Sequence, residues 1–132
     1  MFKLKNVNIE IDKMSIKNNH LEKGEFKLNP NLSRRVGHIK NAEYFTELRL
    51  TIKDEPKSSF PVSIEITIKA IFTFEDVKDE EKNDIDQFLK KQGVHILYPY
   101  LRSAVSNLTT NALLPPLVLP VINAMTLFEN NK

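Results

Sequence analysis

Apolar and polar residues alternate through the first three-quarters of the chain, as they do in antiparallel strands that face a core on one side and water on the other. In the first run, 7–12, the apolar residues occupy odd positions, but they move to even positions at Met14 and Ile16. Because side chains alternate strictly along a regular strand, this change of parity predicts a β-bulge near 12–13.

Three further runs complete a predicted four-stranded sheet. The second run begins at 26–28, and Pro30 makes it an edge strand or a bent strand. The third covers 47–53, and the fourth, 62–75, is the longest and most regular alternation in the chain. The polar segment 54–59 has the composition of a turn, which predicts a hairpin between the third and fourth strands.

Helical patterns follow the strands. In 75–92 the acidic residues come early and the lysines late, and a short apolar stripe repeats at helical spacing, which indicates a short helix. Gly93 is expected to separate it from the main helix. The main helix is predicted from about 97 to 111, with Pro99 in its first turn, and a second short helix is predicted over 121–129.

The main helix is apolar on more than one side. Leu97, Leu101 and Leu108 form one stripe, and Ile96 and Tyr100 lie beside it. One side faces the sheet, so burial of the other requires a second copy of the helix, which predicts a homo-oligomer. The residues assigned to this interface are Leu97, Tyr98, Tyr100, Leu101, Ala104, Val105 and Leu108.

An apolar strip follows the main helix. Residues 113–120 contain no charge and no hydrogen-bonding side chain, and three of them are prolines. Proline prevents a continuous helix there and makes a central strand unsuitable. The strip is therefore either core filler or the wall of a ligand groove, and its length and composition leave both interpretations open.

The composition fits one soluble domain. The 132 residues are 41% apolar and 27% charged, with no cysteine, no apolar run long enough to span a membrane and no signal-peptide core. We therefore expect a cytoplasmic protein without a membrane partner. The predicted fold class is α+β, a four-stranded antiparallel sheet followed by one long and one short helix. It forms a single domain over 1–132, with strands at about 6–76 and helices and linker at about 80–129.

No residue pattern supports catalysis. The three histidines lack metal-ligand spacing, and the acidic run in 79–86 lacks the glycine and glutamate of a calcium loop. The sequence contains neither a nucleophile elbow nor a phosphate-binding loop. We therefore predict that the chain is not an enzyme and uses no metal and no cofactor.

A small basic cluster is interpreted as an exposed loop, with phosphate contact as the alternative. The calculated pI near 8.8 would suit a nucleic-acid-binding β domain. However, 19 basic and 17 acidic residues are interspersed along the chain and leave a net charge of only +2, so no nucleic-acid partner is predicted. The cluster consists of Ser33, Arg34, Arg35, His38 and Lys40.

Residues 95–128 resemble the C-terminal half of the SecB protein-export chaperones. The similarity is concentrated in an Ile-Leu-aromatic-Pro-Tyr-x-Arg helix start at 96–102, a linker of prolines and leucines at 116–121, and a Leu-Phe pair at 127–128. The order of elements, four antiparallel strands followed by a long and a short helix, agrees as well.

The resemblance implies a homotetramer, a dimer of dimers whose long helices pack between two sheets. It also implies an ATP-independent holdase, which keeps non-native polypeptide in apolar grooves between the sheet and the linker and needs no cofactor. Carried over by position, the groove residues are Phe72, Phe74, Leu113, Leu114, Leu117, Val118, Leu119, Leu127 and Phe128.

The chain also departs from the classical export chaperone, which reaches the SecA translocase motor through an acidic sheet surface and a C-terminal tail. Here only four residues follow Phe128. The short C-terminal end and the mixed charge of the predicted polar face argue against a translocase contact. They favour a chaperone dedicated to one client, such as an antitoxin, and they suit equally well a SecB-like protein of a phage or of a bacterium without the classical pathway. The alternative is a SecB-like interaction protein that binds one dedicated partner without a general export function. The predicted polar face of the sheet mixes Glu47, Arg49, Lys53, Glu65 and Lys69.

Overall fold

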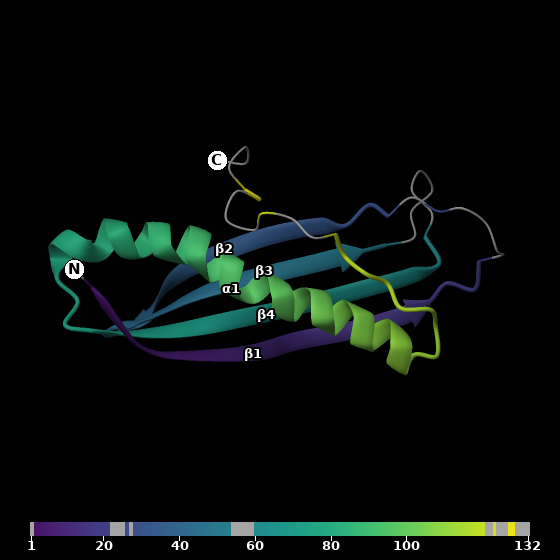
Figure 1. The fold of residues 1–132 in the computed structure, drawn as a ribbon, viewed down its shortest axis with the longest axis horizontal. Helices are drawn as coiled ribbons and strands as arrows, with labels where there is room; N and C mark the ends of the chain where they lie inside the picture. Colours follow the sequence, from purple (N-terminus) through teal and green to yellow (C-terminus); the bar gives the residue numbers. More distant parts are fainter. Residues whose placement is uncertain are drawn as a thin grey trace.

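The computed structural model describes residues 2–21, 26, 28–53, 60–120, 123 and 127–128, and in these residues a sheet of four strands lies against one long helix (Figure 1). In chain order the elements are β1 (Lys3–Asn18), β2 (Asn31–Lys40), β3 (Glu43–Ile52), β4 (Val62–Glu75), a 3-10 turn (Asp79–Glu81) and α1 (Lys82–Asn111). The predicted α+β fold class is confirmed.

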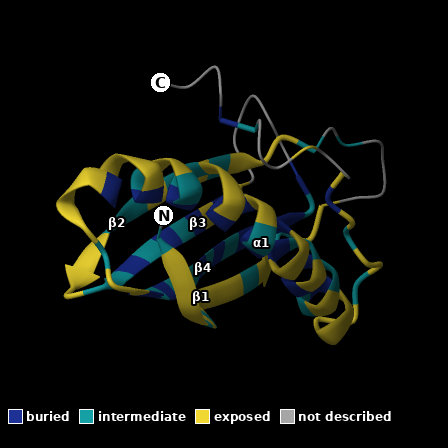
Figure 2. Cartoon of the chain, turned by 60° about the vertical axis from the view of Figure 1, so that its left-hand side comes forward, coloured by how far each residue is buried: buried dark blue, intermediate teal, exposed yellow. Residues whose placement is uncertain are grey.

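The strands are all antiparallel and lie in the order β1-β4-β3-β2. The long strand β4 is therefore central, and every second residue from Val62 to Phe74 is buried. The helix α1 crosses one face of this sheet diagonally, and its buried positions face the strands (Figures 1 and 2). The predicted pairing of the third and fourth strands is confirmed, while the predicted turn at 54–59 lies outside the described residues.

The β-bulge predicted in β1 is confirmed. Ile11 pairs with Ile68 and Lys13 pairs with Thr67, so Asp12 is an extra residue on the bulged strand. After the bulge, the apolar residues of β1 return to the face on which α1 lies. The change of parity in the sequence was thus a local feature of one continuous strand.

The second strand differs from the prediction. It begins at Asn31, after Pro30, and the basic cluster that was interpreted as a loop lies on β2 itself. Arg35 points to the solvent face, whereas Arg34 lies on the helix side, where its Nη1 donates a hydrogen bond to the carbonyl of Lys90 at 2.9 Å. An edge strand tolerates such a residue because the long side chain can bury its stem and still hydrogen-bond its charged end.

The helix is also longer than predicted. Gly93 and Pro99 lie inside one continuous helix of 30 residues. Gly93 is buried against β3, where an added Cβ would lie 2.8 Å from the Cβ of Thr46, so glycine serves close packing there. Pro99 has no N–H, so the carbonyl of His95 loses its hydrogen bond within the helix. Both residues are exposed, so water can hydrate that carbonyl.

The predicted second helix at 121–129 lies outside the described residues except for Asn123, Leu127 and Phe128. The core lies between the sheet and the helix, where Leu48, Ile66 and Leu97 are fully buried. Within the described part of the chain, no helix is long and apolar enough to cross a membrane.

Candidate functional site

An apolar groove lies at the end of the sheet near the C-terminus of α1. It has a volume of about 700 Å³. One wall comes from the end of β1, the residues that follow it and the start of β4, and the other wall is the linker after α1. The lining residues are Asn18, His20, Leu21, Phe26, Phe60, Pro61, Val62, Thr109, Leu114, Pro115, Pro116 and Leu117.

Asn19 holds the first wall in place. Its backbone N–H donates to the carbonyl of Pro61 at 2.9 Å, and its side-chain Nδ2 donates to the carbonyl of Phe60 at 2.9 Å. The same Nδ2 lies 3.0 Å from Oγ of Ser63. The ring of Phe26 packs edge to face against Phe60, with centroids 6.4 Å apart. The wall is therefore an aromatic corner fixed by the partly buried amide of Asn19.

The second wall is held by a polar stripe on α1. Side chains four residues apart lie on one side of a helix. Tyr98 donates from its hydroxyl to the carbonyl of Pro120 at 2.8 Å, Arg102 donates from Nε to Leu119 at 3.1 Å, and Ser106 donates from Oγ to Leu117 at 3.0 Å. The linker therefore runs back along the helix that precedes it.

Thr109 fixes the start of this return. Its buried hydroxyl accepts a hydrogen bond from the backbone N–H of Leu117 at 2.9 Å and lies within donating distance of the carbonyls of Val105 and Ser106. The backbone N–H of Leu114 donates to the carbonyl of Thr109 at 3.0 Å. One threonine thus links both ends of the segment 114–117 to the last turn of α1.

The polar stripe explains how an apolar strip without regular structure can be held in place. Three prolines in 113–120 remove backbone donors, so a strand or a helix cannot satisfy the remaining carbonyls. Side chains of α1 supply the missing donors. The linker therefore stays extended, and the side chains of Leu114 and Leu117 lie in the groove wall.

The structure separates the linker residues that the sequence had grouped together. Leu114 and Leu117 line the groove, but Leu113 is 94% exposed, Val118 is 61% exposed and Leu119 is buried in the core. Neighbouring side chains of this segment point to different sides, whereas Leu114 and Leu117, three residues apart, point to the same side. The linker therefore presents an inner and an outer side.

The other predicted groove residues lie elsewhere. Phe72 and Phe74 are buried near the start of α1, where Phe72 packs against Phe88 and Phe74 against Phe2, each pair with ring centroids 5.3 Å apart. Phe128 is buried under the guanidinium of Arg34, which lies 4.8 Å from the ring centroid, and Leu127 is partly buried beside the core. None of these predicted residues lines the groove.

Sequence reasoning missed the wall opposite the linker. Leu21 and Phe60 stand in polar segments between predicted strands, and Phe26 stands at the start of the predicted second strand. Large apolar residues in such segments were the signal of this wall that the sequence offered, because aromatic side chains in loops are rarely left exposed to solvent. Their convergence on the linker depends on the pairing of β1 with β4, which the alternation pattern does not reveal.

The residues predicted for an oligomer interface are mostly inside the chain's own core. Tyr100 is 54% exposed and Leu108 is partly buried, so these two remain open to a partner. The interface assignment stays a prediction. The five residues buried between α1 and the sheet are Leu97, Tyr98, Leu101, Ala104 and Val105.

Burial also affects the ionisation of the polar stripe. It raises the pKa of the Tyr98 hydroxyl above its ordinary value, and the nearby charge of Arg102 opposes that shift. Tyr98 is therefore a neutral donor to the linker at physiological pH. Among the described residues, no cluster of three His, Asp or Glu side chains could hold a metal ion.

Known proteins are similar to this chain in sequence and in fold. Residues 4–132 match the family described as preprotein translocase subunit SecB. An uncharacterized protein of Methanocaldococcus jannaschii is 33% identical over 115 residues, which cover 83% of this chain and 71% of that protein. The protein-export protein SecB of Dichelobacter nodosus is 31% identical over 109 residues, which cover 77% of this chain and 68% of that protein.

The fold has a close counterpart among solved structures. A SecB-like chaperone of Mycobacterium tuberculosis, solved in complex with a peptide from an antitoxin, superposes with a TM-score of 0.76. The match covers 92% of this chain and 90% of that one at 16% sequence identity, so this likeness concerns the fold. Together with the family match over almost the whole sequence, it shows that the chain belongs to the SecB family.

Proposed function

We propose that this protein is an ATP-independent chaperone that holds apolar segments of non-native polypeptides in the groove between the linker and the start of β4. The observation that carries the proposal is the groove itself, about 700 Å³ with walls of leucine, phenylalanine and proline. Ligand sites commonly measure about 300–1,000 Å³. The groove suits the apolar side chains that an unfolded chain exposes and a folded chain hides.

The way the linker is held supports this proposal. Its backbone carbonyls are engaged by α1, so its inner side presents apolar side chains and few free polar groups. Such a surface favours apolar side chains over any particular sequence, which suits a holdase. Membership of the SecB family and the similarity to the protein-export protein SecB of Dichelobacter nodosus support the same role.

The proposal is tested by aggregation of a chemically unfolded client in the absence of nucleotide. We expect the protein to suppress light scattering at a near-stoichiometric ratio. Replacing the inner side of the linker with the double variant Leu114→Ser/Leu117→Ser should reduce this suppression several-fold. No suppression by the unaltered protein at about tenfold excess over client would reject the proposal.

The linker offers a matched control. Leu113→Ser/Val118→Ser makes two comparable apolar-to-serine changes on the outer side, where both residues are exposed. We expect this variant to retain its suppression of aggregation. Equal losses of aggregation suppression in the two variants would show that client binding does not depend specifically on the inner side of the linker.

A dedicated partner is the second candidate. The solved SecB-like chaperone with the similar fold carries an antitoxin peptide, which favours a role of this chain in binding one particular protein. Pull-down from the native cell distinguishes the candidates. One stoichiometric folded protein, without affinity for unfolded chains, would support the dedicated partner and reject the general holdase.

We also propose that copies of this chain assemble as a homotetramer, a dimer of dimers. The strand order leaves β1 at an edge of the sheet. Leu4, Ile11 and Met14 on this strand are 40%, 44% and 47% exposed, and Tyr100 on the outer side of α1 is 54% exposed. Apolar side chains beside an unpaired strand edge are the features that pairing with another chain would cover.

A further inference from the structure

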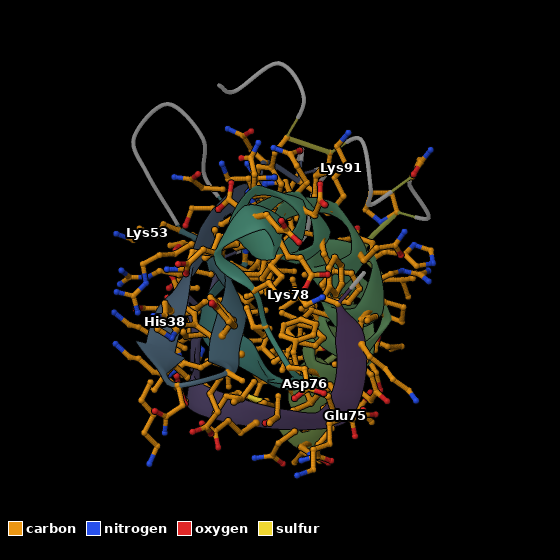
Figure 3. The ribbon with its side chains drawn as sticks, turned by 90° about the vertical axis from the view of Figure 1, so that its left-hand side faces the viewer. His38, Lys53, Glu75, Asp76, Lys78 and Lys91 are labelled. Atoms are coloured by element: carbon orange, nitrogen blue, oxygen red, sulfur yellow. The ribbon has the colours of Figure 1, made fainter. Side chains whose placement is uncertain are left out.

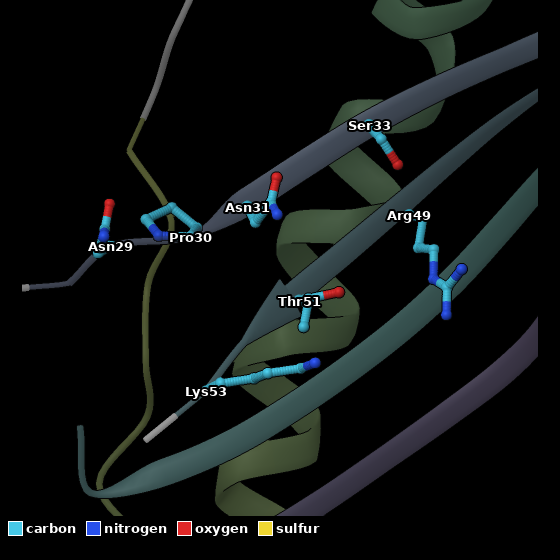
Figure 4. A pocket seen from close by; sticks show the side chains of 7 residues that line it. All are labelled: Asn29, Pro30, Asn31, Ser33, Arg49, Thr51 and Lys53. Carbon is cyan, nitrogen blue, oxygen red and sulfur yellow. The ribbon is translucent and has the colours of Figure 1, made fainter. Parts of the chain in front are cut away.

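The face of the sheet opposite α1 carries a polar trough near the ends of β2 and β3. The hollow with the largest volume in this trough, about 570 Å³, is lined by Asn31, Ser33, Arg49, Thr51 and Lys53 with the preceding residues 29–30 (Figure 4). Two further hollows share residues with it. One shares Thr51 and Lys53 and reaches β1, and the other shares Ser33 and Arg49 and reaches the middle of the sheet. The three hollows therefore adjoin one another across all four strands, and we call them together the trough.

The trough has an excess of positive charge. Its cationic residues are Lys13, Lys17, Arg35, Arg49 and Lys53, and its carboxylates are Glu47 and Glu65. Among the described lining residues, five cations therefore stand against two anions. The uncharged residues between them include several serines and threonines, whose hydroxyls can donate or accept hydrogen bonds.

Both carboxylates of the trough already have cationic partners. Arg49 lies 2.7 Å from Glu65, Lys13 lies 3.2 Å from the same carboxylate, and Arg35 lies 2.9 Å from Glu47. The hydrogen bond from Arg49 and then that from Lys13 hold the pKa of Glu65 below its ordinary value. The acids of the trough are therefore occupied.

Lys17 and Lys53 stand apart from these pairs. In the part of the chain that the structure describes, neither has an ion-pair partner. They lie on β1 and directly after β3, on opposite sides of the central strand, and both line the same hollow. Their positive charges are thus available to a ligand.

We propose that this trough is the docking site for an extended acidic segment of a partner protein. Charge complementarity identifies the occupant: carboxylates of the segment would meet Lys17 and Lys53, and its backbone amides would meet the hydroxyls between them. Nucleic acid fits less well. Glu47 and Glu65 would repel a continuous phosphate backbone, and among the residues that the structure describes no aromatic side chain lines the three hollows to stack a base.

The site is distinct from the client groove. The groove lies on the side of the sheet that α1 covers, whereas the trough lies on the opposite side (Figures 1 and 4). A client and an acidic partner segment could therefore be bound at the same time. The partner would recognise charge, and the client would be held by apolar contact.

Fluorescence anisotropy with a labelled peptide of about ten alternating glutamate and serine residues tests the proposal at low ionic strength. The probe is long enough to cross the four strands at a spacing of about 4.8 Å. We expect binding that weakens with salt and is absent for the same peptide with glutamine in place of glutamate. Lys17→Glu/Lys53→Glu should weaken binding about tenfold.

The matched control is Lys5→Glu/Lys91→Glu, which changes the net charge equally. Lys5 lies near the start of β1, at the other end of the sheet, and Lys91 projects from α1 (Figure 3). Both side chains are exposed and line none of the three hollows. We expect this variant to bind the acidic peptide within about twofold of the unaltered protein.

Three outcomes would overturn the proposal: no binding of the acidic peptide, equal losses in the two double variants, or tighter binding of single-stranded oligothymidylate that Lys17→Glu/Lys53→Glu abolishes. Thermal melting followed by circular dichroism shows whether each variant is folded. Suppression of client aggregation should be unchanged in the trough variant. Failure of the acidic-peptide test therefore leaves the groove proposal intact, and failure of the holdase test leaves the trough intact.

Discussion

At the scale of single residues, Gly93 sets the distance between the two layers of the molecule. Thr46 is fully buried on β3, and its hydroxyl donates a hydrogen bond to the carbonyl of Leu89 at 2.7 Å. This contact brings the helix so close that a Cβ at position 93 would meet the side chain of Thr46. A helix-weakening glycine is therefore retained because the sheet needs the space.

The first prediction concerns this contact. Gly93→Ala should lower the free energy of unfolding by up to about 2 kcal/mol, because overpacking costs about 1–3 kcal/mol and alanine gains roughly 1 kcal/mol in helix propensity. Urea denaturation measures the change. Gln92→Ala, at the exposed neighbouring position, is the control and should be neutral or slightly stabilising. A more stable Gly93→Ala variant would contradict the close approach.

Leu113 is a second residue whose backbone conformation and side chain conflict. It has φ 62°, in the left-handed region, directly after the helix, and its side chain is 94% exposed. Glycine usually fills this position because a Cβ is unfavourable there. The exposed side chain makes no compensating contact within the described chain.

The second prediction follows from that conflict. Leu113→Gly should raise the free energy of unfolding by about 1 kcal/mol, because it removes the left-handed penalty and loses no packing. Leu113→Ala retains the Cβ and should show no such gain. If Leu113→Gly is less stable than the unaltered protein in a denaturant titration, the leucine contacts another copy or a bound partner.

At the scale of elements, the helix both covers the sheet and holds the linker. Tyr98 and Arg102 lie on the side of α1 that binds linker carbonyls, while Leu97 and Leu101 fill the core. Two functions are thus divided between neighbouring positions of one helix. The linker has no regular structure of its own and depends on this stripe.

The third prediction concerns how the hydrogen bond from Tyr98 to the linker affects stability at alkaline pH. Because the pKa of Tyr98 is raised in the folded state, its contribution to stability is complete below the unfolded value of about 10 and is lost as pH rises through the folded value. Tyr98→Phe should cost about 1 kcal/mol near neutral pH and should remove this alkaline loss. Denaturation across the alkaline range measures both effects. An unchanged alkaline loss in Tyr98→Phe would contradict the assignment.

Elements with a simple environment could be predicted from the sequence. The strands β3 and β4 have one buried face and one wet face, so alternation identified them, and the bulge in β1 appeared as a change of parity. The strand β2 was missed because Arg34 and His38 occupy its inner face and Gly37 interrupts the pattern. In these places tertiary packing overrides local preference.

The extent of α1 was predicted wrongly, whereas the assignment of client-groove residues stays a prediction. Gly93 and Pro99 are local signals for a break, but the contact with Thr46 and the exposure of the proline make both acceptable inside α1. The linker side of the groove could be predicted from its own composition. The opposite wall could not, since Phe26 and Phe60 reach it only through the pairing of β1 with β4.

At the scale of the whole molecule, the two edges of the sheet differ. β1 has 16 residues and β2 has 10, and each leaves one side without a neighbouring strand. Ile11 and Met14 lie on the helix side of β1 and are both more than 40% exposed. Ile39 on β2 is also exposed, at 44%, but it stands alone among polar neighbours. The longer edge is the better candidate for assembly.

The fourth prediction tests this edge. Ile11→Lys/Met14→Lys should shift the protein from oligomer to smaller species, because charged residues on an edge strand oppose pairing. Native mass spectrometry at micromolar concentration measures the change. Ile39→Lys, on the other edge, should leave the oligomer intact. A monomeric unaltered protein would reject the assembly proposal, and an unaffected double variant would reject the β1 edge.

The strand order also has a consequence for how the protein is made. β1 pairs with β4, in a register that places Lys3 opposite Glu75 and Asn18 opposite Val62. The first strand therefore has no partner until the chain has been synthesised through β4. Pairings so distant in sequence are slow to form, and the waiting segment is prone to aggregation. The groove needs the linker at 114–117 as well, so it does not exist until most of the chain has left the ribosome. During its own synthesis, the protein is therefore an unfolded chain with an unprotected apolar strand. The surface with which it would hold another unfolded chain forms only later.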